Sequence, residues 1–434
     1  MKRRIAILGG GPMGLTCAYE LLKEGFDVTV IEKEDKLGGM SASFDFGGIT
    51  IEKYYHFINM PDSILFSMLD ELGIKEDLIF NDTKMGFFRK DSDGAYRLYN
   101  WGKPTSLLKL RDIPFITRFR YGLHVYLCKF RKNLIPLDKI SAKNWIEKWE
   151  GKLGYKLFWD FLFYKKFFEF SDPLSSAWIA SRIRRVANSR KSLAREQLGY
   201  LKGGTQEFID ALKSKILENK GSIDLNAEVT SIEKHNDEFL LSIKNKVGKQ
   251  SFDYVISTIP LKYLTNICLE LPNEYLSKLN RLNNVGCACA LFKLRSPLTE
   301  NFWLNVDVDD WCIPGVIEYS NLRKGMDGSF VYVPLYMPKT NPNWDKSDNE
   351  LLELCKNYLS KINEKSVSDV IGSTISRYEY AQPVCDVNFM DKLPSYETGI
   401  ENFLAADTSH SFPEDRSLNE SIRIAKELAR KISL

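Results

Sequence analysis

Residues 4–32 read RIAILGGGPMGLTCAYELLKEGFDVTVIE. This stretch begins with the apolar run Ile5–Leu8, continues through glycines, and then places apolar residues at helical spacing over Leu15–Lys23. A second apolar run, Val28–Ile31, ends at Glu32. The order strand, glycine turn, helix and strand predicts a right-handed βαβ unit and a Rossmann-type α/β fold.

The glycine turn suits the pyrophosphate of a dinucleotide. Gly9 allows the tight turn, Gly11 lets the backbone approach the phosphates, and Gly14 lets the helix pack closely on the strand. Glu32 follows Gly14 by 18 residues, where a carboxylate would accept both hydroxyls of an adenosine ribose. We therefore expect a dinucleotide site that contains Gly9, Gly11, Pro12, Met13, Gly14 and Glu32.

The residues after Glu32 point to the kind of dinucleotide. Glu32-Lys33 followed by Leu37-Gly38-Gly39-Met40-Ser41 resembles the second glycine motif of the flavoproteins that include amine oxidases, protoporphyrinogen oxidases and UDP-galactopyranose mutases. The resemblance implies that FAD is the cofactor, bound non-covalently, and that this segment runs along it. Small side chains would let backbone N–H groups approach phosphate. The FAD contacts implied here are Lys33, Gly38, Gly39, Met40 and Ser41.

Three further segments are similar to motifs of the same flavoproteins. The stretch from Gly47-Gly48 to Tyr54-Tyr55-His56-Phe57 resembles the one beside the flavin ring, which implies contacts from Tyr55 and His56. Val229 stands where members of the group touch adenine. The C-terminal segments 404–407 and 415–419 resemble a strand-Asp motif and a helix start that faces flavin N1 and O2. The residues implied by this last motif are Asp407, Ser417, Leu418 and Asn419.

The rest of the chain predicts a second unit. Residues 61–200 are expected to form a helical insertion, because they are rich in aromatic residues and have no glycine between Gly154 and Gly199. Residues 285–340 and 370–380 alternate like strands, which predicts an antiparallel sheet. We therefore expect a FAD-binding domain from residues 1–72, 198–262 and 395–434. Residues 73–197 and 263–394 would form a mixed helical and antiparallel-sheet substrate domain.

Charge is balanced over the whole chain but not locally. The 434 residues contain 60 Lys and Arg and 57 Asp and Glu, a net charge of +3, which excludes a surface built to hold nucleic acid. Residues 103–132 and 182–202 are strongly basic. Three interpretations of these basic stretches stay open. They are a solvated helix face, a phosphate site in the substrate domain and, for residues 103–132, a patch that contacts a membrane surface. If these stretches form a phosphate site, Arg182, Arg184 and Lys202 are the residues expected to bind a small phosphate-bearing substrate.

Few residues are candidates for catalysis. His56 is either an acid or base beside the flavin or a residue that shapes the cofactor site. Glu318 is either a substrate ligand or base, or a paired carboxylate at a strand end. Arg416 either approaches the flavin or a substrate phosphate, or forms a salt bridge with Asp415 or Glu420. The substrate candidates from segments similar to a bacterial protoporphyrinogen-oxidase-like branch, associated with surface polysaccharides, are Asn321, Tyr380 and Gln382.

Composition also bears on metals and on the compartment. Eight cysteines without a CxxC pair, and four histidines, give no metal-binding pattern, so no metal is expected. Scattered thiols and the lack of an apolar leader after Met1-Lys2-Arg3-Arg4 predict a cytoplasmic protein. Any contact with the inner membrane face would involve residues 103–132.

These observations together predict a FAD-dependent oxidoreductase. No second GxGxxG motif follows a strand, so a separate NAD(P)H site is not expected. The basic residues and the resemblance favour a phosphorylated or nucleotide-linked sugar that transfers a hydride to flavin N5, in surface-polysaccharide biosynthesis. An amine or porphyrinogen-type oxidase, a redox-neutral flavin-dependent sugar mutase and a FAD-bearing binding subunit are the alternatives.

Overall fold

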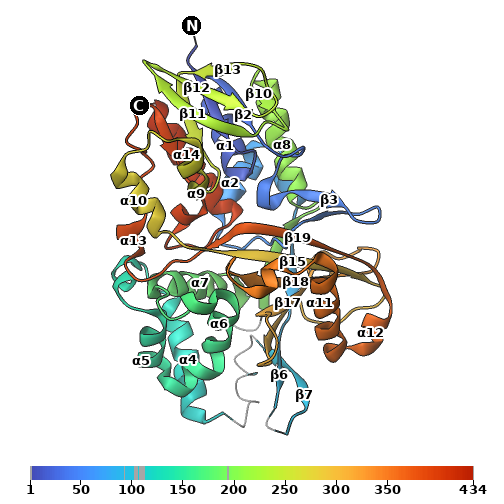
Figure 1. The fold of residues 1–434 in the computed structure, drawn as a ribbon. Helices are drawn as coiled ribbons and strands as arrows, with labels where there is room; N and C mark the ends of the chain where they lie inside the picture. Colours follow the sequence, from blue (N-terminus) through green and yellow to red (C-terminus); the bar gives the residue numbers. More distant parts are fainter. Residues whose placement is uncertain (1, 92, 102–105, 107–112, 193–194, 434) are drawn as a thin grey trace.

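A five-stranded parallel sheet forms one end of the molecule in the computed structural model, which describes residues 2–91, 93–101, 106, 113–192 and 195–433 (Figure 1). Its strands, in spatial order, are β10 (Ser222–Asp224), β2 (Asp27–Ile31), β1 (Arg4–Leu8), β14 (Tyr254–Ser257) and β20 (Phe403–Ala405). Every neighbouring pair is parallel. The predicted βαβ unit is therefore confirmed, and segments far apart in the sequence complete its sheet.

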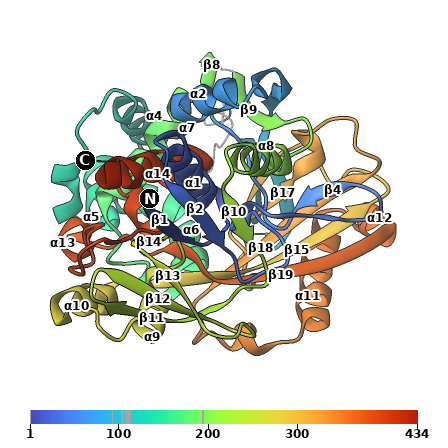
Figure 2. The ribbon, with the colours of Figure 1, turned by 90° about the horizontal axis from the view of Figure 1, so that it is seen from above.

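Helices cover one face of this sheet and a smaller sheet covers the other (Figure 2). Ile5 and Ile7 of β1 share a core with α1 (Pro12–Lys23), α2 (Ser63–Glu71), α8 (Thr205–Glu218) and α14 (Leu418–Ser433). Ala6 and Leu8 point the other way, into a core with the antiparallel strands β11 (Val229–His235), β12 (Glu238–Ile243) and β13 (Lys249–Phe252). Alternate side chains of β1 therefore pack into two different hydrophobic cores, one on each face of the sheet.

The second large sheet has seven strands. In spatial order they are β19 (Val370–Pro383), β15 (Asn284–Leu294), β18 (Ser329–Met337), β17 (Gly315–Glu318), β16 (Trp303–Asp307), β6 (Met85–Lys90) and β7 (Tyr96–Trp101). Among the described strand pairs of this sheet, only the β16–β6 pair is parallel. The antiparallel sheet expected from residues 285–340 and 370–380 is confirmed. Helices α11 (Asp348–Ile362) and α12 (Glu364–Ser368) lie beside it (Figure 1).

A helical layer follows β7 in the sequence. It contains α4 (Phe115–Cys128), α5 (Ala142–Tyr155), a π-helical turn (Lys156–Asp160), α6 (Phe161–Phe167) and α7 (Ser176–Asn188). None of the described helices has the length and apolar character needed to cross a bilayer.

The prediction that residues 61–200 are helical is confirmed for α2 and for the helical layer, but it is wrong for the two segments that flank this layer. Strands β5 (Leu78–Thr83), β6 and β7 precede the helical layer, and β8 (Arg190–Ser192) and β9 (Arg195–Leu201) follow it. The aromatic residues of this stretch favour strands as well as buried helix faces. Phe88 of β6 and Tyr96 of β7 stack across the strand pair, with ring centres 5.7 Å apart.

The remaining α-helices and strands are β3 (Ser43–Asp45), β4 (Thr50–Glu52), α9 (Leu261–Ile267), α10 (Asn273–Arg281) and α13 (Phe389–Lys392).

Candidate functional site

A cavity of about 1180 Å³ lies at the carboxyl ends of the parallel strands. Its walls come from the loops after β1 and β2, from β15, β18 and β19 of the large sheet, and from α7. Ligands of open α/β sheets bind at this edge, where the strand ends leave a crevice. The cavity is therefore the candidate site for both a dinucleotide and a substrate.

The turn between β1 and α1 leaves room for a cofactor. Gly11 lines the cavity, and a Cβ built there would meet no atom within 4 Å. A Cβ at Gly14 would instead overlap the carbonyl oxygen of Gly9, so α1 packs directly on the strand. Gly9, Pro12 and Met13 also line the cavity, whereas Gly14 does not. The first turn of α1 is thus open to the cavity, which fits a pyrophosphate.

Glu32 directly follows β2 at the cavity wall and is 8% exposed. Its two carboxylate oxygens accept the N–H groups of Gly10 at 2.6 Å and Glu34 at 2.9 Å. A carboxylate accepts up to about four hydrogen bonds. Both oxygens therefore keep capacity for the hydroxyls of a ribose. Lys33 and Val229 line the same cavity.

The second glycine motif packs against the first. The N–H of Gly38 donates to the carbonyl of Gly10 at 2.8 Å, and Gly38 lies behind the cavity wall. The following turn lines the cavity with Gly39, Met40 and Ser41. The hydroxyl of Thr205, at the start of α8, donates to the carbonyl of Ser41 at 2.7 Å. The two motifs therefore form one continuous wall.

His56 lines the cavity with a defined tautomer. Its Nδ1 lies 2.7 Å from the carbonyl oxygen of Tyr54, which can only accept, so Nδ1 carries the proton. Burial, with a smaller contribution from the positive charge of Arg416, lowers the pKa of His56 to about 4, although the hydrogen bond to Tyr54 opposes this. The ring is therefore neutral near pH 7, with Nε2 as an acceptor.

Asp407 and the start of α14 reach the cavity from the C-terminal segment. The two carboxylate oxygens of Asp407 accept the N–H groups of Ser409 at 2.8 Å and Leu261 at 3.0 Å. Asp407, Ser417 and Leu418 line the cavity. The first turn of α14 thus presents its backbone to the cavity, where a helix start favours negative charge.

Cationic side chains gather at the part of the cavity formed by α6, α7 and residues 415–416. Arg182 pairs with Asp415, and Arg185 pairs with Asp62 at 2.9 Å. Burial would raise the pKa of Asp415, but Arg182 and its other cationic neighbours hold it well below its usual range. This end of the cavity is therefore built around permanent guanidinium charges.

Lys166 lies at the same end, and none of the described carboxylates forms a salt bridge with its ammonium. Its ammonium is 4.9 Å from the ring centre of Tyr336 and 5.5 Å from that of Trp178. Among the described residues, none accepts a hydrogen bond from it. Burial, and next the charge of Arg182, lower the pKa of Lys166 well below its usual range, although Asp415 opposes this. Lys166 is thus a cavity residue that an added anion would satisfy.

Arg416 joins this end of the cavity to the predicted flavin side. It donates to the side-chain oxygen of Gln382 and, at 3.2 Å, to the hydroxyl of Tyr336. The Tyr336 hydroxyl is also 3.2 Å from that of Tyr55. Arg416, Tyr55 and Tyr380 line the cavity, whereas Gln382 lies behind it and holds Arg416.

Glu318 does not line the cavity and is 2% exposed. Its carboxylate accepts the N–H groups of Leu298 at 2.8 Å and Thr299 at 2.7 Å, and the hydroxyl of Ser329 at 2.6 Å. Burial raises its pKa, while these hydrogen bonds favour the ionised form. Its placement supports a structural role that ties a loop to the large sheet, in place of the predicted catalytic one.

Two basic substrate candidates also lie away from the cavity. The guanidinium of Arg184 pairs with Glu414 and donates to the carbonyls of Arg131 and Lys132, at 3.1 and 3.2 Å. Lys202 is exposed. Of the three arginines on α7, the structure thus brings Arg182 and Arg185 to the cavity and directs Arg184 to the helical layer.

Two predicted asparagines bind backbone groups elsewhere. The amide of Asn321 donates to the carbonyls of Thr299 and Asn301, at 3.1 and 2.9 Å. The side-chain oxygen of Asn419 accepts two N–H groups from the first turn of α2, at 3.1 and 3.2 Å. Neither side chain lines the cavity, because each satisfies the end of another element.

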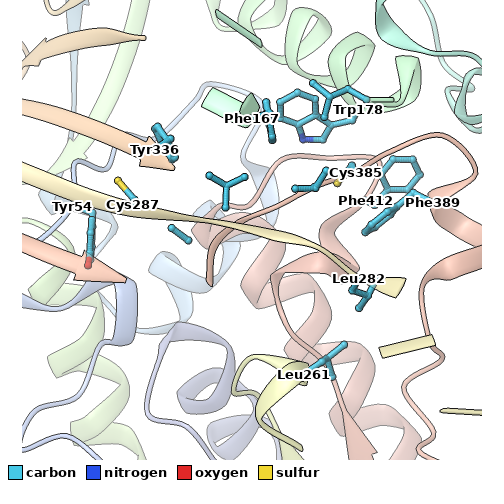
Figure 3. Close-up of a cluster of buried hydrophobic side chains, with 14 of the residues drawn as sticks. Tyr54, Phe167, Trp178, Leu261, Leu282, Cys287, Tyr336, Cys385, Phe389 and Phe412 are labelled. Atoms are coloured by element: carbon cyan, nitrogen blue, oxygen red, sulfur yellow. The ribbon is translucent and has the colours of Figure 1, made fainter. Parts of the chain in front are cut away.

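Several cavity residues escaped sequence reasoning. They are Lys166, Cys287, Tyr336 and Tyr378. Figure 3 shows Cys287 and Tyr336 close together, and they are direct partners on the adjacent strands β15 and β18. The same view shows Trp178 of α7 against Phe167 of α6. A lysine pair inside the aromatic run of residues 158–170 was the available signal for Lys166.

The family comparison covers most of the chain. A family model described as "Flavin containing amine oxidoreductase" matches residues 14–407. A zeta-carotene desaturase of Arabidopsis thaliana is 24% identical over 243 residues, which are 52% of this chain and 43% of that protein. A flavin-dependent L-tryptophan oxidase of Lentzea aerocolonigenes is 24% identical over 336 residues, which are 70% of this chain and 68% of that protein.

Solved structures share the fold over the full length. A putrescine oxidase bound to putrescine has a TM-score of 0.73 at 15% identity, covering 100% of this chain and 99% of that one. An oxidoreductase from Methanosarcina mazei has a TM-score of 0.73 at 16% identity, covering 98% of this chain and 100% of that one. At these identities the likeness establishes the fold alone.

Proposed function

The chain belongs to the flavin-containing amine oxidoreductase family, and from this premise we propose that it oxidises a small substrate that carries a phosphate group. The protein is an enzyme and its cofactor is FAD. When bound, FAD supplies a two-electron acceptor for a C–H bond of the substrate. The remaining chemistry comes from the side chains of the cavity.

The residues that would hold FAD follow the cavity wall. The open first turn of α1 would hold the pyrophosphate, and Glu32 would accept from a ribose. The turn at Gly39–Ser41 and the start of α14 would contact the flavin half. We also infer that residues 1–72, 198–262 and 395–434 form the FAD-binding domain, because these three segments supply all strands of the parallel sheet.

The observation that carries the substrate proposal is the unpaired Lys166 beside Arg182 and Arg416. An anionic group on the substrate would accept from Lys166 and restore its protonated form. Charge-assisted hydrogen bonds of this kind are strong in a largely buried site. Phosphorylated or nucleotide-linked sugars carry such a group, and we propose this class, as used in surface-polysaccharide biosynthesis.

The neutral residues near this end would orient the substrate. His56 offers its Nε2 as an acceptor for a hydroxyl proton, without needing to change charge near pH 7. Tyr55 packs edge-on against Trp303, with ring centres 5.7 Å apart, so both rings present fixed surfaces to the cavity. These contacts would hold a sugar ring in place and keep water away from it.

An anaerobic titration of the purified protein tests the proposal. We expect a flavin absorbance spectrum that is bleached by one of a panel of UDP-, GDP- and dTDP-sugars. Spectral shifts without bleaching, followed by turnover after prior reduction of the flavin, would indicate a redox-neutral sugar mutase. Bleaching by amines or porphyrinogens, with no response to any phosphorylated sugar, would overturn the proposed substrate class.

An amine or porphyrinogen-type oxidase remains the second candidate. The aromatic side chains of Tyr55, Trp303 and Tyr336 line the cavity and suit a planar or apolar substrate. The guanidinium groups of Arg182 and Arg416 disfavour a cationic amine at the same end. We therefore rank this candidate below the anionic substrate.

A further inference from the structure

The outer side of α4 carries an unusual set of exposed apolar side chains, which we name the α4 face. Its members and their exposed fractions are Phe115 64%, Ile116 61%, Phe119 55%, Leu123 40%, Tyr126 54%, Leu127 41% and Phe130 60%. Phe115, Phe119, Leu123, Tyr126 and Phe130 are spaced three or four residues apart, with Ile116 and Leu127 beside them. They form one stripe along α4 that continues to Phe130, just after the helix ends. Figure 1 shows α4 in the helical layer, at the end of the molecule opposite to the N-terminus.

The stripe does not contribute to the core, because the other side of α4 does. Thr117, His124 and Cys128 are buried against the helical layer. His124 stacks on Trp149 of α5, with ring centres 5.5 Å apart, and its Nδ1 lies 2.6 Å from a carboxylate oxygen of Glu150. The fold therefore fixes α4 by one side and leaves seven large apolar side chains in water. Contiguous exposed patches of this kind mark interaction surfaces.

Basic residues accompany the α4 face. Residues 113–137 contain five Lys or Arg and no Asp or Glu: Arg118, Arg120, Lys129, Arg131 and Lys132. Arg120 donates to the backbone of α5, whereas Lys129, Arg131 and Lys132 are exposed directly after the helix. Residues 103–105 and 107–112 of the predicted basic stretch lie outside the described residues. The described part alone combines an apolar stripe with positive charge.

We propose that the α4 face docks on the surface of a bilayer that contains anionic lipids. An amphipathic helix with aromatic and leucine side chains on one side and Lys or Arg around them lies in the interface between headgroups and acyl chains. Anionic headgroups complement Lys129, Arg131 and Lys132. A second copy of the chain suits the face less well, because a two-fold contact would bring the same basic residues together.

The proposed docking goes beyond the reaction and does not depend on it. Helix α7 lies between α4 and the cavity: Arg182 of α7 lines the cavity, and Arg184 of the same helix binds the backbone of Arg131 and Lys132. Docking through α4 would therefore hold the cationic end of the cavity at a fixed height above the membrane. Reduction of the flavin by a dissolved substrate tests the reaction separately.

Flotation of the purified FAD-bound protein with vesicles tests the proposal. We expect binding to vesicles of equimolar phosphatidylcholine and phosphatidylglycerol, and at least tenfold weaker binding to phosphatidylcholine alone. Added salt should weaken the binding, because it screens the headgroup charge. The triple variant Lys129→Glu, Arg131→Glu and Lys132→Glu should lose at least about 100-fold in affinity, since each basic residue near an anionic surface contributes roughly fivefold.

Two matched sets of variants separate the α4 face from general surface effects. Phe115→Ser, Phe119→Ser and Phe130→Ser together should abolish binding, whereas Val247→Ser, Leu269→Ser and Ile371→Ser remove exposed apolar side chains elsewhere and should not. Lys356→Glu, Lys361→Glu and Lys365→Glu control for net charge. No flotation of the unaltered protein, or equal flotation of both serine variants, would overturn the proposal. A dimer in light scattering that only the α4 variant loses, without vesicle binding, would assign the face to a second copy instead.

Discussion

Arg416 donates from Nη2 to the hydroxyl of Tyr336 at 3.2 Å, and that hydroxyl lies 3.2 Å from the hydroxyl of Tyr55. Gln382 accepts from the other side of the same guanidinium. One residue of the C-terminal segment is therefore held by two strands of the large sheet and reaches the cavity in a fixed position. This arrangement makes Arg416 the strongest candidate for anchoring an anion.

Substitution of Arg416 should weaken anion binding. The variant Arg416→Lys keeps the charge but cannot reach Gln382 and Tyr336 together, so we expect the dissociation constant for inorganic pyrophosphate to rise about tenfold or more. The change in flavin absorbance on titration measures it. The control is Arg184→Lys, because Arg184 lies on α7 close to Arg182 but outside the cavity. Equal affinities of the two variants would contradict this role.

Lys166 should destabilise the folded protein near neutral pH. Burial lowers its pKa, so unfolding takes up a proton at any pH between the folded and unfolded values, and stability rises with pH. We expect Lys166→Met to raise the free energy of unfolding by about 1–2 kcal/mol near pH 7, and less as the pH approaches 10. Thermal melts across this range measure the difference. A gain that grows with pH would be inconsistent with a lysine whose pKa is lowered by burial.

His56 should leave no step in the pH dependence of flavin reduction between pH 5 and pH 8. Burial lowers its pKa to about 4, so the ring stays neutral across this range. The unfolded ring takes up a proton below about pH 6.5, and stability therefore falls as the pH drops from there toward 4. Stopped-flow rates of the protein and of His56→Gln should have the same pH profile. A step near pH 6.5 that the variant lacks would show that the histidine ionises during the reaction.

Glu318→Gln should change stability and leave binding unaltered. The carboxylate accepts two N–H groups and two hydroxyls, and an amide cannot accept all of them. We expect a loss of about 1.5–3 kcal/mol in the free energy of unfolding. Denaturant titration measures this loss, and the FAD content and the rate of flavin reduction should remain within about twofold. A large fall in that rate at unchanged stability would restore Glu318 as a catalytic candidate.

Gly11→Ala should fold normally but bind FAD poorly. A Cβ at this position meets no protein atom, so its methyl group would occupy only cavity space where the pyrophosphate is expected. The ratio of flavin to protein absorbance after purification should fall severalfold, with an unchanged circular dichroism spectrum. Gly14→Ala is the contrasting variant, because its Cβ overlaps the carbonyl oxygen of Gly9 and should prevent folding. A full complement of FAD in Gly11→Ala would argue against pyrophosphate at this turn.

The sequence predicted the parts of the site that depend on local order. Residues 9–14 and Glu32 lie within one βαβ unit, and their spacing alone predicts their common position. Lys166, Tyr336 and Arg416 come from three elements that the fold brings together over more than 200 residues, so no spacing reports their proximity. Glu318 and Asn321 failed as site predictions for a related reason. A polar residue at a strand end looks the same in the sequence whether it faces a cavity or satisfies a neighbouring loop.

The three arginines of α7 each hold a different acid: Arg182 holds Asp415, Arg184 holds Glu414 and Arg185 holds Asp62. All three contacts are half-buried or buried, and each joins the helical layer to residues that belong to the parallel-sheet end of the chain. Separating the helical layer from the parallel-sheet end would break these three ion pairs together and leave their charges without partners. Local opening of the helical layer is therefore costly, and the two halves of the molecule should melt in a single cooperative transition.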